Sequence, residues 1–335
     1  MGIYVEEKSY PKKHLAAVIL AVVILLLVIT GMFAFSDVIS VKNSGTVNIT
    51  EGMTVSGIAE YMKENEIIRF PLVFRAISRI KGYDTKIHTG QIEVQPGMSY
   101  SDILNELINA QPETVKVVIP EGYEIGEIAE KLSGLVSKEE FYEALSYDYD
   151  YKFLKDLPDR EVRLEGYLFP STYAFPLDFT AEEIINTMLA AFDEMFKDEY
   201  YDRANELGMT VDQIVTLASV IERESNSGED RAKVAGVFYN RLNQNMRLQS
   251  CATVQYILKE RKPVLSTADT KIDSPYNTYM NSGLPIGPIA SPGEECIKAA
   301  LYPEETTALY FVLGPDGKHI FSDTYEQHLD AKNGG

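Results

Sequence analysis

The segment at residues 210–225, TVDQIVTLASVIERES, predicts the helix that organises the rest of the chain. Thr210 and Gln213 have the spacing of a capping box, which satisfies free backbone N–H groups where a helix begins. At about 100° per residue, the apolar side chains form one stripe and the polar ones face away from it. The stripe contains Val211, Ile214, Val215, Leu217, Ala218 and Ile221, and the polar side contains Asp212, Gln213, Thr216, Ser219 and Arg223.

Glu222 is the exception, because its side chain projects into the apolar stripe between Val211 and Val215. A carboxylate in such a place is paired with a cation, lines a cleft, or keeps its proton because burial disfavours the charged form. The last two possibilities describe a general acid, and the first describes a structural ion pair. Glu224 lies about 200° around the helix from Glu222, so we interpret it as structural and expect no catalytic pair between the two.

The composition limits the classes of function. With 335 residues, the chain can form one large domain or two to three smaller ones. Its formal net charge of −19 argues against a nucleic-acid partner, which would require a basic surface. The two cysteines, Cys251 and Cys296, match no metal-ligand spacing, and the four histidines are scattered. We therefore expect neither a metal site nor a cofactor.

An uncharged, apolar run occupies residues 15–35. As a helix it would be about 31 Å long, which matches a hydrocarbon core of roughly 30 Å. A cleaved signal peptide, the alternative, has a shorter apolar region and a small-residue cleavage site. We expect a retained single-pass anchor in the cell membrane. Lysines precede it and Asp37 follows it, so residues 1–14 form a cytoplasmic tail and the rest of the chain lies outside the membrane.

Three strand–turn–helix patterns follow a linker at residues 36–45. Their turns contain Gly52, Gly97 and Gly122, and an apolar helical segment follows six residues after each glycine. The glycines are unequally spaced, so no solenoid is expected. The pattern at residues 46–115 resembles the LysM-type module, a small strand–helix unit that binds N-acetylglucosamine polymers. The alternative to a glycan-binding module is a set of strand–turn–helix units that only pack together.

Residues 116–335 are expected to form a mixed domain with long loops. The segments at 164–173, 274–279 and 283–293 contain too much Pro and Gly for regular structure. Alternation at residues 309–313 and 318–322 predicts a hairpin. Long loops in compact domains are often functional, and aromatic side chains in them can stack on sugar rings. The predicted fold class is α+β: an anchor, a LysM-like module, and a mixed α+β catalytic domain.

The order of these segments resembles the endolytic murein transglycosylases, the YceG-like family. The matching segments are residues 164–170, 217–224, 238–242, 247–254, 274–279, 283–293 and 319–328. The chain departs from the family at Cys251-Ala252, where many members have Asp-Pro. We therefore expect no catalytic role at that position.

The resemblance implies that Glu222 is the catalytic acid. Glu222 is also the residue that the helical stripe singles out independently of the resemblance. It further implies cleavage between N-acetylmuramic acid and N-acetylglucosamine in nascent peptidoglycan, leaving a 1,6-anhydromuramyl end and terminating strand elongation. A lone acid suffices, because the muramyl C6 hydroxyl attacks in place of water. The expected partners are peptidoglycan strands, the lipid bilayer through residues 15–35, and peptidoglycan synthases (penicillin-binding proteins).

Several polar residues are candidates for substrate binding. Amide, hydroxyl and phenol groups suit sugar hydroxyls, but each can instead hold an irregular loop. These candidates are Glu165, Ser219, Asn240, Gln249, Tyr276, Asn277 and Tyr279. Glu165 is also the candidate for a second acidic group near the site, whereas His319 and His328 are interpreted as structural.

Three classes of function remain open from the sequence. The first is the membrane-anchored lytic transglycosylase. The second is a glycoside hydrolase that uses water, with Glu165 or another acid as partner, because most glycoside hydrolases need two carboxyl groups. The third is a non-catalytic glycan-binding scaffold for wall synthesis.

Overall fold

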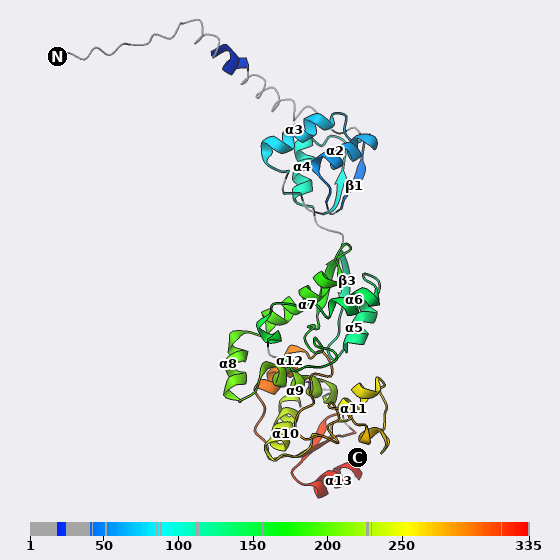
Figure 1. Cartoon of the computed structure of the whole chain (residues 1–335), viewed down its shortest axis with the longest axis vertical. Helices are drawn as coiled ribbons and strands as arrows, with labels where there is room; N and C mark the ends of the chain where they lie inside the picture. The colour runs from blue at the N-terminus through cyan, green and yellow to red at the C-terminus, as the bar shows by residue number, and fades with distance from the viewer. Residues whose placement is uncertain are drawn as a thin grey trace, which may run out of the picture. The chain divides into compact units, whose positions relative to one another are not determined.

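The computed structural model describes residues 19–24, 41, 43–50, 52–84, 86–87, 89–110, 114–155, 157–225, 228, 230–315 and 317–333. The chain divides into an N-terminal unit, Met1–Thr114, and a C-terminal unit, Val115–Gly335 (Figure 1). A separate cluster of buried apolar residues forms the core of each unit. The mixture of helices and short strands agrees with the predicted α+β class.

Within the described residues from 41 to 110, the N-terminal unit contains one antiparallel strand pair and the helices α2, α3 and α4. Strand β1 (Gly45–Ile49) pairs with β2 (Gly90–Val94), so that Val47 lies opposite Ile92. Every second residue of each strand points into the core, which the helices cover. The helices are α2 (Val55–Glu64), α3 (Pro71–Lys81) and α4 (Tyr100–Ile108). The LysM-like character of this unit stays a prediction.

Among the residues that the structure describes, no helix is long and apolar enough to cross a membrane. Of the predicted anchor at residues 15–35, only residues 19–24 are among them. The anchor therefore stays a prediction.

The C-terminal unit is mostly helical. Its first strand, β3 (Thr114–Val118), pairs with β4 (Thr172–Pro176), and β5 (Tyr310–Leu313) pairs with β6 (His319–Ser322) in the predicted hairpin. Two short 3-10 helices lie at Lys152–Leu154 and Asp269–Lys271. The α-helices are α5 (Ile125–Leu132), α6 (Lys138–Ala144), α7 (Ala181–Met195), α8 (Asp198–Glu206), α9 (Val211–Glu224), α10 (Arg231–Asn243), α11 (Cys251–Leu258), α12 (Glu294–Leu301) and α13 (Tyr325–Asn333).

Local signals in the sequence explain where these elements begin. The capping box at the start of α9 is confirmed, since the Thr210 hydroxyl accepts from Gln213 N at 3.1 Å and Gln213 Oε1 accepts from Thr210 N at 2.9 Å. The three predicted glycine turns are also confirmed. Gly52, Gly97 and Gly122 have φ values of 78°, 95° and 75°, which side chains other than glycine rarely adopt.

Helix α9 is the centre of the C-terminal unit, in contact with α8, α10, α11 and α12 (Figure 1). The predicted polar face of this helix is wrong in part, because Asp212, Thr216 and Ser219 are buried. Neighbouring helices and loops cover the helix on more than one side, and the Asp212 and Ser219 side chains have hydrogen-bond partners inside the protein. The Asp212 carboxylate binds the buried Arg160 guanidinium at 2.8 Å and the Tyr167 hydroxyl at 2.8 Å.

Candidate active site around Glu222

Glu222 lies in the last turn of α9, half-buried, with its carboxylate against the start of α12. The backbone N–H of Gly293, the N-cap of α12, donates to Glu222 Oε2 at 2.9 Å. The thiol of Cys296, one turn into α12, also hydrogen-bonds to this carboxylate. Gly293 ends the predicted loop at residues 283–293, so tertiary packing joins this loop to the helix that carries Glu222.

A second carboxylate, that of Glu121, lies beside Glu222 at the same glycine. A Cβ atom on Gly293 would overlap the Glu121 carboxylate, so this close approach requires glycine. Glu121 belongs to the turn between β3 and α5. This turn is fixed to the 283–293 loop by two backbone hydrogen bonds of 2.8 Å, from Gly122 N to Ser291 O and from Ser291 N to Tyr123 O.

The surroundings of Glu121 favour its neutral form. Burial raises the pKa of the Glu121 carboxyl above its ordinary value, and the charge of Glu222 raises it further. Arg231, whose Nη2 lies 3.9 Å from Glu121 Oε2, opposes the shift, while Glu295 adds to it. Two carboxyl groups this close disfavour double ionisation. Glu121 therefore keeps a proton to a higher pH than an exposed glutamate does.

Cys296 is positioned as a hydrogen-bond donor to Glu222. The residue is fully buried, and burial followed by the charge of Glu222 raises the pKa of its thiol. A thiol with a raised pKa stays protonated at neutral pH, and its S–H can donate to a carboxylate. The Glu222 carboxylate is thus held from the α12 side by one N–H and one S–H group.

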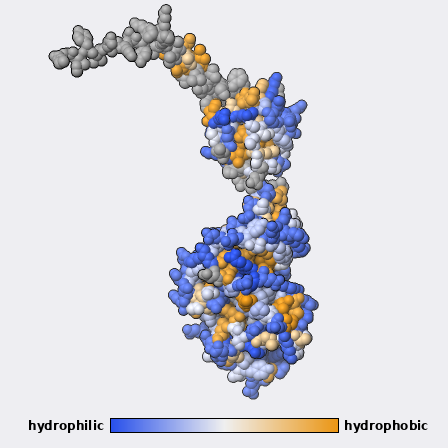
Figure 2. All heavy atoms as spheres, viewed as in Figure 1, coloured by the Kyte–Doolittle hydropathy of each residue, from blue (hydrophilic) through white to orange (hydrophobic). Residues whose placement is uncertain are grey.

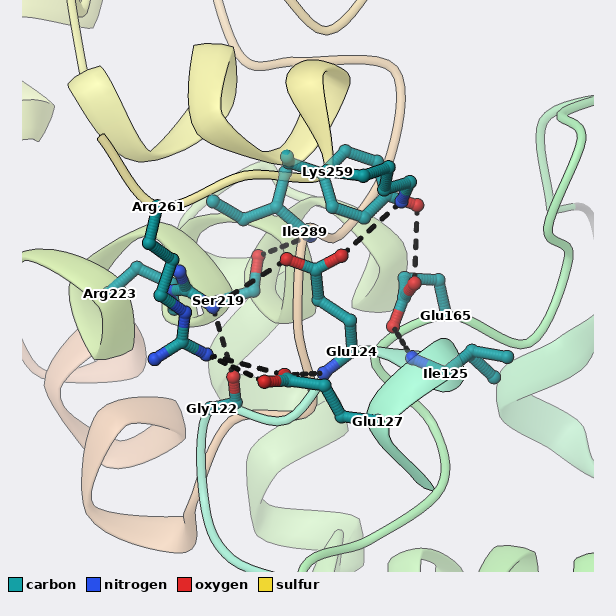
Figure 3. A network of polar contacts seen from close by, with 11 residues as sticks. Gly122, Glu124, Ile125, Glu127, Glu165, Ser219, Arg223, Lys259, Arg261 and Ile289 are labelled. Atoms are coloured by element: carbon teal, nitrogen blue, oxygen red, sulfur yellow. Dashed lines mark hydrogen bonds and ion pairs between the residues drawn. The ribbon is translucent and has the colours of Figure 1, made fainter. Parts of the chain in front are cut away.

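A network of charged residues fixes the turn that carries Glu121 to α9 (Figure 3). Arg223, next to Glu222 in the sequence, donates from Nη1 to Gly122 O at 3.2 Å and lies 3.7 Å from Glu124 Oε1. On the other side of Glu124, Lys259 Nζ lies 3.3 Å from Oε2. Arg223 therefore holds the β3–α5 turn against α9.

Glu165, the predicted second acidic group near the site, belongs to this network and makes no hydrogen bond to Glu222. It is 1% exposed, accepts from Ile125 N at 3.1 Å and accepts from the Tyr256 hydroxyl at 3.2 Å (Figure 3). Burial, followed by the charge of Glu124, raises the pKa of Glu165 to about 8. The acidic neighbour of Glu165 is thus Glu124, whereas that of Glu222 is Glu121, which sequence analysis missed.

Three other predicted site residues use their polar groups to hold loops. The Ser219 hydroxyl donates to Thr216 O at 2.7 Å and accepts from Ile289 N at 3.0 Å, which fixes the 283–293 loop to α9 (Figure 3). Asn240 donates to Thr306 O and Ala308 O. Asn277 is fully buried and donates to Thr270 O and Ile272 O.

The remaining candidates lie on two loops that contact each other through the 3.1 Å hydrogen bond from Gln249 N to Thr278 O. Gln249 is exposed and has a φ of 50°, an uncommon value for a residue other than glycine. The Tyr276 ring packs on Tyr256 with centroids 4.9 Å apart, and the Tyr279 hydroxyl lies 3.0 Å from Cys251 Sγ. Substrate binding by these residues stays a prediction.

Glu224 has a structural role at the start of α11. The Ser250 hydroxyl donates to Glu224 Oε1, and the backbone N–H of Ala252 donates to the same carboxylate. An anion at this position satisfies free N–H groups and interacts favourably with the helix dipole. The glutamate two residues beyond Glu222 therefore faces another helix, as its angle around α9 predicted.

Comparison with known proteins identifies the family. The model of the YceG-like family matches residues 47–334. A protein named endolytic murein transglycosylase from Bacillus subtilis is 33% identical over 306 residues, which cover 87% of this chain and 84% of that protein. A protein of the same name from Streptococcus pneumoniae serotype 2 is 34% identical over 320 residues, with 86% of this chain covered. The chain spans 57% of the length of that streptococcal relative.

A solved structure supports the same assignment. The crystal structure of a putative yceG-like protein from Listeria monocytogenes has 33% sequence identity and a TM-score of 0.58. The match covers 86% of this chain and 99% of the Listeria chain. With a family match over most of the sequence, the chain belongs to the YceG-like family.

Proposed function

We propose that this protein is a membrane-anchored lytic transglycosylase that cleaves within peptidoglycan glycan strands, with Glu222 as its acid–base group. The observation that carries the proposal is the Glu222 carboxylate, held by Gly293 N–H and Cys296 beside Glu121. The names of the relatives support the same activity. The proposed bond is that between N-acetylmuramic acid and N-acetylglucosamine.

In the proposed reaction, protonated Glu222 gives its proton to the glycosidic oxygen. The bond from the muramyl C1 to that oxygen breaks, its electron pair goes to the leaving N-acetylglucosamine, and the sugar develops oxocarbenium character. The muramyl C6 hydroxyl then attacks C1 and passes its proton to the Glu222 carboxylate. The products are a free hydroxyl on N-acetylglucosamine and a 1,6-anhydromuramyl end, with no water consumed and Glu222 restored.

Glu121 supports this reaction as a positioning residue. When Glu222 gives up its proton, an ionised Glu121 beside it would add a second negative charge at the same place. The raised pKa of Glu121 reduces that cost, because a larger fraction of Glu121 is neutral at a given pH. Fixed donors on Glu222 then stabilise its ionised form without reorganisation.

The cellular placement is part of the proposal. The apolar run at residues 15–35 would anchor the chain with its N-terminus in the cytoplasm and the Glu222 site outside. A fixed anchor would hold the site near the membrane, where synthases extend new strands. We propose that cleavage there terminates the elongation of glycan strands, and that penicillin-binding proteins are the partner synthases.

The decisive test is the chemistry of the new ends. The full chain in detergent is incubated with purified glycan strands, and the products are analysed by mass spectrometry. We expect 1,6-anhydromuramyl ends, lost in Glu222→Gln and retained in Glu182→Gln, a matched change on the exposed side of α7. Circular dichroism checks that both variants fold. Full activity of Glu222→Gln would refute the assignment of this site.

A glycoside hydrolase is the second candidate function, and the Glu121 carboxyl beside Glu222 is the observation that favours it. Most glycoside hydrolases use two carboxyl groups, one as acid and one to activate water or form a covalent intermediate. Reducing muramic acid ends would identify that reaction. No cleavage by the folded full chain would instead favour the glycan-binding scaffold.

A further inference from the structure

The outer face of α3, in the N-terminal unit, exposes apolar side chains that none of the residues described by the structure covers. Leu72 is 73% exposed and Ile80 is 54% exposed, and Phe70, the N-cap residue, is 45% exposed. The opposite face of the helix already supplies Phe74 and Ile77 to the core. Helix α3 thus has one apolar surface for the core and another that faces solvent.

Basic side chains lie between these apolar groups. Arg75 and Arg79, three and seven residues after Leu72, fall on the same side of the helix as Leu72 and are exposed. They line a depression of about 360 Å³ between α2 and α3, together with Val55, Ser56, Leu72, Ala76 and Asp84. Asp84 is engaged elsewhere, since its Oδ1 accepts from Ser78 Oγ at 2.6 Å. Figure 2 shows orange and blue atoms side by side on this unit.

The charge of this segment is opposite to that of the chain. Residues 69–81, RFPLVFRAISRIK, contain four basic residues and no acidic residue, in a protein of net charge −19. A helix that combines exposed apolar residues with arginines is typical of surfaces that lie in the headgroup region of anionic membranes. Guanidinium groups bind phosphate oxygens in a bidentate manner, so two arginines in a depression that also contains Val55 and Leu72 suit phospholipid headgroups.

Asn43 lies close to the segment that leads into α3. Asn43 Nδ2 donates to Glu66 O at 3.1 Å, and Glu66 is five residues before Pro71, the first residue of α3. The start of α3 is itself held, because the Tyr100 hydroxyl accepts from Arg69 N and Phe70 N at 3.0 Å each. Phe35, the end of the predicted anchor, is eight residues from Asn43, a span of at most about 28 Å.

From these observations we infer that the outer face of α3 docks on anionic phospholipids of the membrane that holds the anchor. The inference rests on the proposed anchor for its geometry. Leu72 and Ile80 lie among the headgroups and upper acyl chains, and Arg75 and Arg79 bind lipid phosphates. Docking would add a second contact to the single span and restrict the orientation of the N-terminal unit at the membrane.

The test places a fluorescent label on this face in the full chain. Exposed Cys251 is replaced by serine, buried Cys296 is kept, and bimane is attached to Ile80→Cys. A second protein carries the label on Glu93→Cys, at an outward position of β2, a strand that contacts α4. Both proteins are reconstituted into vesicles of brominated phosphatidylglycerol or brominated phosphatidylcholine, whose bromine atoms quench the label on contact.

We expect quenching at position 80 in phosphatidylglycerol, less in phosphatidylcholine, and little at position 93 in either lipid. The double variant Arg75→Glu, Arg79→Glu lowers the ratio of docked to free α3 by at least about 25-fold, since each basic residue near an anionic surface contributes about 5-fold and each glutamate adds repulsion. High salt lowers it as well. The matched variant Lys116→Glu, Lys131→Glu changes the net charge equally at exposed positions of the C-terminal unit and leaves quenching unchanged.

Two results would overturn the inference. One is quenching at position 80 that is no stronger than at position 93, which would leave the face to a protein or glycan partner. The other is equal quenching in both lipids that the arginine variant does not alter. Extraction of the vesicles with alkaline carbonate tests the anchor separately. Release of the chain from the vesicles refutes the anchor, and this result does not depend on the quenching at position 80.

Discussion

Replacing Glu165 by glutamine should make the protein more stable at neutral and alkaline pH. The carboxyl group is fully buried, accepts one backbone N–H and one phenol, and has its pKa raised from 4.5 to about 8 by burial and by Glu124. Glutamine has the same shape, keeps a carbonyl oxygen for Ile125 N, and never ionises. The substitution therefore removes the cost of ionising a buried group while it preserves the packing.

The magnitude follows from proton linkage. A group with a raised pKa in the folded state supports folding fully below its unfolded pKa, and this support is lost as pH rises through the folded pKa. For values of 4.5 and about 8, the loss is about 1 kcal/mol at pH 5, about 3 kcal/mol at pH 7 and at most about 5 kcal/mol at pH 9. The stability of Glu165→Gln relative to the unmodified chain should rise along this curve.

The assay is urea unfolding followed by far-UV circular dichroism at several pH values, because the chain contains no tryptophan for fluorescence. Glu182→Gln on the exposed side of α7 is the matched control and should show no such curve. A stability difference between Glu165→Gln and the unmodified chain that stays constant from pH 5 to 9 would refute the reasoning. It would mean that Glu165 ionises without cost, through solvent or a closer cation than Lys259.

Three further predictions concern the site and its support. Glu121→Gln keeps the neutral form at every pH, so it should retain most of the kcat on glycan strands, unlike loss of a general acid at ~10²–10⁴-fold, and should change the pH dependence of kcat/KM; an unchanged profile would count against the carboxyl pair. Gly293→Ala should displace the Glu121 carboxylate and change the pH dependence of kcat/KM as Glu121→Gln does, with little loss of stability in urea unfolding because the displaced group is the end of a flexible side chain; an unaltered pH dependence would show that the contact is dispensable. Arg160→Ala leaves Asp212 charged and buried, so it should cost about 3–5 kcal/mol, and a smaller loss in the Arg160→Ala, Asp212→Ala double variant would confirm that the stranded charge is the cause.

Local structure was predictable from sequence where short-range contacts decide it. The Thr210 capping box, the turns at Gly52, Gly97 and Gly122, and the hairpin of β5 and β6 all depend on residues within a few positions of one another. Their backbone conformations and hydrogen bonds follow from the side chains present, with little influence from the rest of the fold.

The burial of α9 was predicted less well. A helical wheel places Thr216 and Ser219 on a polar face, yet both are buried because α12 and the 283–293 loop lie against that side of the helix. Serine and threonine are ambiguous in such patterns, since their hydroxyl groups can donate a hydrogen bond to a backbone carbonyl of their own helix. Ser219 does so, and its hydroxyl also accepts from Ile289 N.

The second carboxylate shows the same limit at the site. Glu165 was a reasonable candidate from its aromatic, loop-rich segment, and its polar partners are Ile125 and Tyr256. Glu121 lies beside Glu222 because two turns, one after β3 and one before α12, meet through Gly122 and Ser291. These positions are more than 100 residues apart in sequence, so no local pattern could have joined them.

The helix at residues 211–224 and the projection of Glu222 into its apolar stripe were set by the sequence alone, through periodicity and capping. The surroundings of that carboxylate were decided only by tertiary structure: the N–H of Gly293, the thiol of Cys296 and the carboxyl of Glu121. The physical reason is that helical geometry acts over three or four residues, whereas the electrostatic environment of an acid depends on every group that folding brings near it.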